Sequence, residues 1–124
     1  MEAEIEKLVD QFLGDFEAAR FEGYHRFFAG PGLVLIMPGA GVMRGLDEYL
    51  AYEGRSTKLS ERRVSWEERA IDVFGNVARV MGLLTMSFAV GGETKRIREY
   101  VTFLLERQQE NGWKCFHLQA TLAG

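Results

Sequence analysis

The last stretch of the chain, from Gly112 to Leu122, has the spacing of a β-strand whose two faces differ chemically. His117, Gln119 and Thr121 stand at alternate positions, with apolar residues between them. Successive side chains of a strand point to opposite faces, so these three polar side chains share one face. A row of hydrogen-bonding groups opposite a hydrocarbon face predicts a polar patch inside a cavity.

His117 is the clearest titrating group in this row. A histidine pKa of about 6.5 suits general acid–base catalysis near neutral pH, although a structural histidine bonded to a neighbour is the alternative. Gln119 and Thr121 could orient His117 or a ligand, or could only satisfy each other's hydrogen bonds. A pair with His25 would allow dehydratase-like or metal chemistry. Two histidines without a placed carboxylate make a poor metal site, and we expect no metal and no cofactor.

Alternation also groups Arg98, Tyr100 and Thr102 on one face of the preceding strand. A buried guanidinium at Arg98 would hold a carboxylate, phosphate or enolate through a two-pronged contact, and it would need an acidic partner. An arginine on the surface or on a dimer face is the alternative. Tyr100 could donate a hydrogen bond to a ligand, or could be a core tyrosine. The acids that could pair internally with the arginine are Glu68, Asp72 and Asp15.

Met37 and Trp66 are interpreted as part of the lining of an apolar pocket, together with the other methionines and the phenylalanines. The flexible thioether of methionine fills irregular apolar space. The same residues could instead form an ordinary core that only sets shape. Cys115 is interpreted as a small buried hydrophobe, because no neighbour in the sequence would lower its pKa.

Composition narrows the class of protein. A chain of 124 residues with 47% hydrophobic residues can form one domain with a core, expected to span residues 1–124. Its net charge of −3 argues against nucleic-acid binding, because an acidic surface repels phosphate backbones. The single cysteine fits a reducing, cytoplasmic setting. The acidic N-terminus and the short apolar runs predict neither a signal peptide nor a membrane span.

Helical patterns predict the elements of the first half. Apolar residues recur every three or four positions over residues 3–22, which predicts a helix that Gly23 ends or kinks. A short second helix or turn is expected at 24–28, and a third helix at 46–54. Between them, a short apolar run predicts a buried strand at 33–37, followed by a loop at 38–41.

From residue 62 onward the pattern changes to long strands joined by tight turns. The strands are predicted at 62–74, 77–90, 94–107 and 113–122. Turn residues separate them at 75–76, 91–92 and 109–112. Helices followed by an antiparallel meander predict an α+β fold, in which the first helix covers the apolar face of a curved sheet. Such a sheet leaves a cavity with one open end.

Three stretches resemble the nuclear transport factor 2-like superfamily, which includes ketosteroid isomerase, scytalone dehydratase and SnoaL-like polyketide cyclases. These are Phe16-x-x-Ala19-x-x-x-Gly23 with the aromatic residues after it, Met37-Pro38-Gly39 with Gly45 after it, and Gly112-Trp113-Lys114-x-x-His117-x-Gln119-x-Thr121. With the order of the elements, the resemblance covers nearly the whole chain, and it is closest to uncharacterised bacterial members.

The resemblance implies a cone-shaped half-barrel, with helices on a curved and mostly antiparallel sheet, and a homodimer through the convex sheet face. It places the pocket on the concave face. The residues of the last two strands that it assigns to this pocket are Arg98, Tyr100, Thr102, His117, Gln119 and Thr121. The catalytic groups of ketosteroid isomerase have no counterpart, since their positions correspond to Met37, Leu13 and Thr102.

Three functions remain open at this point. The first is binding of a small, partly apolar molecule above a polar floor that contains Arg98 and His117. The second is an isomerase, cyclase or hydro-lyase with His117 as the acid–base group and Tyr100 or Arg98 stabilising an oxyanion. The third is a dimeric scaffold whose cavity is filled by side chains. The apolar face of the last strand supports a dimer, because such a face left in water would form a sticky patch.

Overall fold

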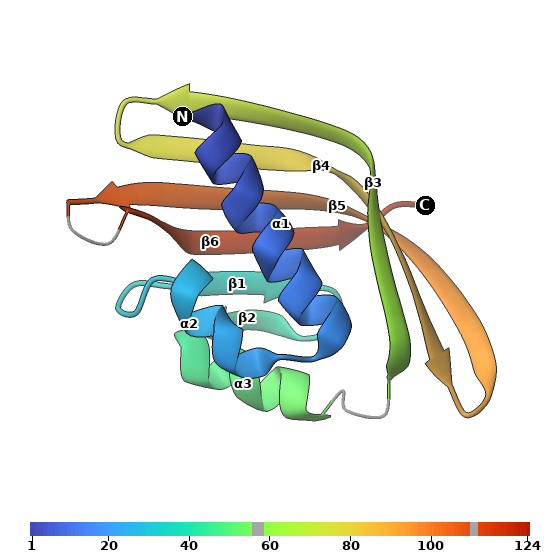
Figure 1. Cartoon of the computed structure of the whole chain (residues 1–124). Helices are drawn as coiled ribbons and strands as arrows, with labels where there is room; N and C mark the ends of the chain where they lie inside the picture. The colour runs from blue at the N-terminus through green and yellow to red at the C-terminus, as the bar shows by residue number, and fades with distance from the viewer. Residues whose placement is uncertain (56–58, 110–111) are drawn as a thin grey trace.

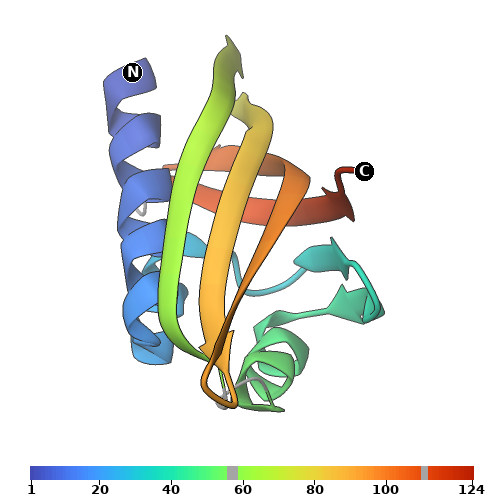
Figure 2. The ribbon, with the colours of Figure 1, turned by 90° about the vertical axis from the view of Figure 1, so that its right-hand side faces the viewer.

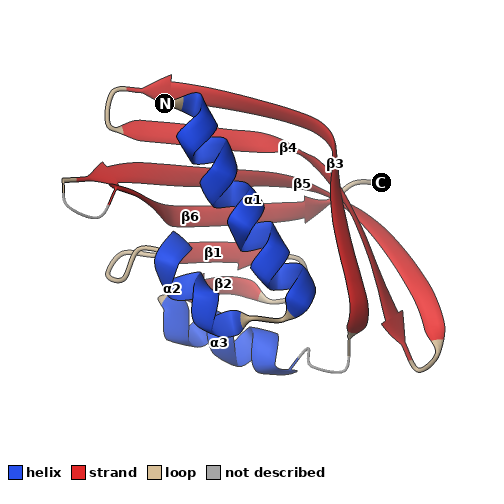
Figure 3. Cartoon of the chain, in the orientation of Figure 1, coloured by secondary structure: helices blue, strands red, loops and turns tan. Residues whose placement is uncertain are grey.

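The computed structural model describes residues 1–55, 59–109 and 112–124. It shows the predicted α+β architecture, with helices packed on one curved sheet (Figure 1, Figure 3). The sheet order is β2-β1-β6-β5-β4-β3, and every pairing is antiparallel except that of β1 with β6. In chain order the elements are α1 (Glu2–Ala18), the 3-10 turn η1 (Phe21–Gly23), α2 (Tyr24–Phe27), β1 (Val34–Met37), β2 (Gly41–Arg44), α3 (Leu46–Arg55), β3 (Ser60–Phe74), β4 (Val77–Val90), β5 (Glu93–Gln108) and β6 (Gly112–Leu122).

Helix α1 covers the concave face of the sheet. Figure 1 shows it crossing the long strands, and Figure 2 shows it along one side of the sheet. Ile5, Val9 and Phe12 form its buried stripe, at the spacing of successive helical turns. The helix ends earlier than the pattern predicts, because Ala19 adopts a left-handed conformation with φ of 56°. The chain then continues as η1 rather than as further α-helix.

Strand β2 is an element that the sequence pattern did not predict. The expected loop at 38–41 is a turn that leads directly into β2, which pairs antiparallel with β1. The strand has only four residues, of which Met43 alone is buried. Four residues are too few for a period to be recognised, so the pairing with β1 defines this strand.

The four long strands lie within about two residues of their predicted bounds, and the hairpins at 75–76 and 91–92 are present. Of the predicted turn at 109–112, residues 110–111 lie outside the described part. The pairing of β3 with β4 shifts between Ser60 and Arg63 and again between Trp66 and Glu68. Such bulges bend a strand and increase its twist. Figure 1 shows the start of β3, the end of β4 and the start of β5 turning toward the end of the molecule that holds α3.

A further bulge in β6 decides which of its side chains face inward. Cys115 pairs with Leu105 and His117 pairs with Leu104, so Phe116 is an extra residue without a partner on β5. A single extra residue reverses the faces of all that follow. The prediction that the odd positions of this strand face one cavity is therefore wrong. The inward side chains are Trp113 and Cys115 before the bulge, and Leu118 and Ala120 after it.

The core lies between the helices and the concave face of the sheet. Phe12 is at its centre, with its ring centroid 4.8 Å from that of Phe27 and 5.0 Å from those of Tyr24 and Phe28. Contacts of this kind add to the stabilisation that burial of the rings provides. No helix in the described part of the chain is long and apolar enough to cross a membrane.

Candidate functional site

The polar residues predicted on β5 and β6 do lie together, but on the outer, convex face of the sheet. Tyr100 pairs with Thr121, and Thr102 pairs with Gln119. Tyr100 is 56% exposed, and the concave face at this level is formed by the intervening residues Val101 and Ala120. Alternation thus grouped the two rows correctly. Their face is opposite to the one that the resemblance implied.

Arg98 also lies on the outer face and is not buried. Its Nε donates to Oε2 of Glu67 at 2.8 Å, and its Nη2 donates to Oε1 at 3.1 Å. These hydrogen bonds raise the pKa of Arg98 and lower the pKa of Glu67. Its partner is therefore Glu67, and not one of the acids that the sequence suggested. The hypothesis that Arg98 is a buried anion-binding group is wrong, because its side chain belongs to a surface ion pair. The alternative, an arginine on the surface, is what the structure has.

Neither histidine lies on the concave side of the sheet in an arrangement suited to catalysis. His117 Nε2 lies 3.4 Å from Oε1 of Gln119 on the outer face, and His25 is exposed on α2. Within residues 1–55, 59–109 and 112–124, no three His, Cys, Asp or Glu side chains are grouped so that they could hold a metal. Cys115 is fully buried, and burial raises its thiol pKa to about 12. A thiol with such a pKa is not a nucleophile at neutral pH.

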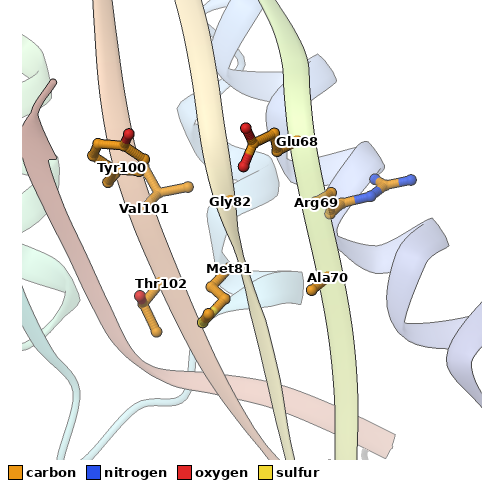
Figure 4. Close-up of a pocket in the computed structure, with 8 residues that line it drawn as sticks. All are labelled: Glu68, Arg69, Ala70, Met81, Gly82, Tyr100, Val101 and Thr102. Atoms are coloured by element: carbon orange, nitrogen blue, oxygen red, sulfur yellow. The ribbon is translucent and has the colours of Figure 1, made fainter.

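The outer face carries a shallow hollow, here called the outer groove, with a volume of about 350 Å³. Figure 4 shows its side chains, which come from β3, β4 and β5. Tyr100 and Thr102 are among them, so two of the predicted site residues line a concavity on this side. The full lining is Glu68, Arg69, Ala70, Met81, Gly82, Tyr100, Val101 and Thr102.

The concave side holds two adjoining cavities. The inner cavity lies deep in the cone and measures about 40 Å³. About 10–15 Å³ of such volume holds one water molecule, so side chains leave room for no more than a few waters. Its lining is apolar apart from Tyr49 and Glu99, and the other members are Phe12, Leu13, Phe16, Met37, Val64, Leu84, Met86, Val101, Phe103, Leu118 and Ala120.

The mouth cavity adjoins it and measures about 290 Å³. Its lining includes residues of α3, of the end of β1 and of the bent ends of β3, β4 and β5. Figure 1 shows these bent strand ends on the side of the molecule that holds α3. Met37 lines both cavities, whereas Trp66 packs against the core and belongs to neither lining within the described residues. The lining is Phe16, Met37, Pro38, Tyr52, Glu53, Leu59, Arg62, Met86, Phe88, Ile97, Glu99 and Leu122.

A buried ion pair forms one wall of the mouth cavity. Arg62 Nη1 donates to Oε2 of Glu53 at 3.3 Å and to the carbonyl oxygen of Phe16 at 3.2 Å. Both side chains of the pair are almost fully buried. Burial raises the pKa of Glu53, and the charge of Arg62 together with a hydrogen bond from Tyr49 acts in the opposite direction. The bulge near Ser60 contributes, since Glu61 takes a left-handed φ of 52° and Arg62 turns inward.

Glu99 is the functional candidate that the sequence interpretation missed. It lies on the concave face of β5, is 5% exposed, and lines both cavities. Among the residues that the structure describes, its carboxyl group has no hydrogen-bond or ion-pair partner, and burial raises its pKa. A signal was present: Val101, Phe103 and Leu105 mark the apolar face of this strand, and Glu99 is in phase with them.

The comparisons with known proteins agree with this fold. The family model of the SnoaL-like domain matches residues 5–123. An NTF2-like superfamily protein from Salmonella enterica subsp. enterica serovar Typhimurium str. LT2 superposes with a TM-score of 0.90 at 19% identity, over 98% of this chain and 90% of that one. The CaMKII hub of S. rosetta superposes with a TM-score of 0.83 at 19% identity, over 96% and 94% of the two chains.

A third similar structure is a candidate ketosteroid isomerase from Shewanella frigidimarina NCIMB 400, with a TM-score of 0.78 at 18% identity over 93% and 92% of the two chains. At such identities the likeness shows the fold alone. No curated protein matches the chain. The family model covers nearly the whole sequence, and on that basis the chain belongs to the SnoaL-like domain family, with the fold of the nuclear transport factor 2-like protein above.

Proposed function

We propose that the protein binds a small, partly apolar molecule in the mouth cavity, with Glu99 as the polar anchor. The observation that carries this proposal is that Glu99, a residue only 5% exposed, lines the mouth cavity beside apolar side chains and has no hydrogen-bond or ion-pair partner in the described part of the chain. Burying such a group without compensation costs several kcal/mol, or about 1–3 kcal/mol for a neutral polar group. A ligand that hydrogen-bonds to it would offset that cost.

The size of the cavity limits the ligand. Ligand pockets typically measure about 300–1,000 Å³, so the mouth cavity is at the lower end of this range. The inner cavity adds almost nothing, because side chains occupy it. The expected ligand is therefore one small ring or a short chain with a single polar group. The polar floor proposed for it consists of Glu99, Tyr52 and the Glu53–Arg62 pair, in place of the polar residues of the outer face.

An isomerase, cyclase or hydro-lyase is the second candidate, and the raised pKa of Glu99 favours it. A carboxyl group whose pKa is moved toward neutrality can both accept and release a proton during a reaction. In this version Glu99 replaces His117 as the acid–base group, because His117 lies on the far side of the sheet. Substitution Glu99→Gln should then lower turnover by about 100-fold or more, the usual scale for loss of such a group.

A homodimer through the outer face completes the proposal. Leu118 and Ala120 of β6 cannot support it, because they are buried in the chain's own core. Support comes instead from the outer groove, where Met81 is 42% exposed and Tyr100 is 56% exposed. Exposed apolar side chains in a hollow favour association with another surface. One of the similar structures is itself described as a hub domain.

Methionine methyl groups offer a direct test of the ligand site. Met37 and Met86 line the mouth cavity, whereas Met81 lies in the outer groove. In protein labelled with ¹³C at the methionine methyls, fragments from a small-molecule library should shift the NMR signals of Met37 and Met86 and leave that of Met81 in place. Substitution Ile97→Trp, which fills the mouth, should abolish the shifts, and Ala70→Trp in the outer groove should not. Fragments that move only Met81 would contradict the proposal.

A further inference from the structure

The charges around the mouth cavity are unequal, and this imbalance bears on the chemistry of its ligand. Two carboxyl groups, Glu53 and Glu99, line the cavity together with one guanidinium, Arg62. Glu53 already pairs with Arg62. Arg98, the neighbour of Glu99 in sequence, points to the other face and pairs with Glu67. An ionised Glu99 therefore leaves one negative charge in the cavity that no described side chain neutralises.

The remaining walls suit an organic cation with an apolar body. Tyr52 and Phe88 supply aromatic rings, and rings attract ammonium groups through the negative charge of their faces. Met37, Met86 and Ile97 provide adaptable apolar surface beside them. Arg55 lies at the end of α3, where its charge acts to lower the pKa of Tyr52. Its side chain is exposed and is not part of the cavity wall.

Other head groups fit this wall less well. A carboxylate ligand would be repelled by Glu53 and Glu99, and it would compete with Glu53 for the charge of Arg62. A neutral hydroxyl would leave Glu99 either protonated or ionised without a counter-charge. An ammonium group supplies both the opposite charge and the hydrogen-bond donors that a carboxylate accepts.

We propose that the mouth cavity is selective for a protonated amine on a small apolar body, with the ammonium group on the Glu99 carboxylate and the body against Met37, Met86 and Phe88. This inference rests on the proposed ligand site and adds the class of ligand. It assigns Glu99 the role of counter-charge, while Glu53 and Arg62 in the same lining stay paired with each other.

The test compares three probes that share a phenyl ring and a short tether: 2-phenylethylamine, 2-phenylethanol and 3-phenylpropanoate. Binding is followed in the wild-type protein at the methyl signals of Met37 and Met86, with Met81 as the internal reference. The amine should bind about tenfold or more tightly than the alcohol, which is the scale of a hydrogen bond to a charged group, and the carboxylate should bind most weakly. This comparison needs no variant.

Glu99→Gln then identifies the group responsible. It keeps the shape of the side chain and removes its charge, so affinity for the amine should fall by about tenfold or more while affinity for the alcohol changes little. Glu68→Gln in the outer groove is the matched control and should change neither. Equal affinities for amine and alcohol at Met37 and Met86 would overturn the amine inference and leave the ligand site standing. Probes that shift only the NMR signal of Met81 would overturn both the amine inference and the proposed ligand site.

Discussion

At the scale of single residues, the Glu53–Arg62 pair is the polar feature with the largest expected effect on stability. Both groups are buried, so loss of the arginine alone would leave a buried carboxylate without its counter-charge. We expect Arg62→Met to lower the free energy of unfolding by about 3–5 kcal/mol at neutral pH. Urea denaturation measures this change.

Two further variants make that result specific. The double variant Glu53→Met with Arg62→Met should recover much of the loss, because it removes both charges and keeps apolar volume. Arg69→Met removes an arginine that pairs with Glu6 and Asp10 near the surface, and it should cost no more than about 1 kcal/mol. A loss for Arg62→Met as small as that for Arg69→Met would show that the buried pair contributes little.

Glu99 predicts a pH dependence of stability with a definite sign. Burial raises its pKa above the ordinary value of 4.5, so the folded protein holds the proton more tightly than the unfolded chain. Between the ordinary and the raised pKa, the folded state binds more protons, and the free energy of unfolding falls as pH rises. Glu53 acts with the same sign, because its pKa is also raised.

Glu99→Gln should remove the contribution of Glu99 to this fall. The variant should match the wild type below about pH 4, where the carboxyl group is protonated in both states, and exceed it in stability at neutral pH. Denaturation in urea at several pH values from acid to neutral measures the difference. A difference that does not grow with pH would mean that Glu99 gains an ionic partner in the folded protein.

The residue scale is also where sequence reasoning about the site was least successful. The polar rows of β5 and β6 were grouped correctly, because alternation depends only on backbone geometry. Their face was assigned wrongly. On β6 a single extra residue, Phe116, reverses the faces of the residues after it, and its side chain gives no sign of a bulge. On β5 the face was taken from the resemblance. The apolar phase of Val101, Phe103 and Leu105 would have identified the inner face, and with it Glu99.

At the scale of elements, the sequence predicted nearly everything that depends on a long period. Helix α1 and the strands from β3 to β6 repeat their apolar positions over ten or more residues, so the type of each element is clear. The parts of the fold that the sequence did not predict are short. Strand β2 exists because β1 offers it an edge, and α1 ends at Ala18 although the helical pattern continues past it. Tertiary contacts, rather than local pattern, decide such elements.

The bulge in β3 brings its backbone close to Gly82 of the neighbouring strand β4, and this close approach can be tested. A methyl group added at Gly82 would collide with the carbonyl oxygen of Glu68, at the bulge between Trp66 and Glu68. The obstacle is backbone and cannot move aside, so Gly82→Ala should destabilise the protein by about 1–3 kcal/mol or more. Thermal denaturation measures this loss.

Gly14 provides the opposite expectation within the same chain. It lies inside α1, and an added methyl group there would meet nothing within 4 Å. Because glycine inside a helix is less favourable than alanine, Gly14→Ala should stabilise the protein by about 0.5–1 kcal/mol. If Gly82→Ala proved as harmless as Gly14→Ala, the close approach of the two strands at the bulge would be disproved.

At the scale of the whole molecule, the order of elements was enough to predict an α+β cone, since an antiparallel sheet with one apolar face needs a helical cover. The contents of the cone were not predictable in this way. Its volume depends on how far Phe12, Met37 and Leu118 fill the interior, and they fill the inner part almost completely. A function tied to the cone therefore has to be located at its mouth, which bulges and bent strand ends shape.

Association is a property of the whole molecule, and the outer groove provides the last prediction. We expect the chain to sediment as a dimer at micromolar concentration, and Met81→Glu to shift it to a monomer, because the new carboxylate would be desolvated at the interface. Val42→Glu is the matched control: Val42 is 55% exposed on the edge strand β2, away from the groove lining. Sedimentation velocity distinguishes the two species. A wild-type monomer would disprove the dimer, and a dimer that survives Met81→Glu but is lost in Val42→Glu would place the interface on β2.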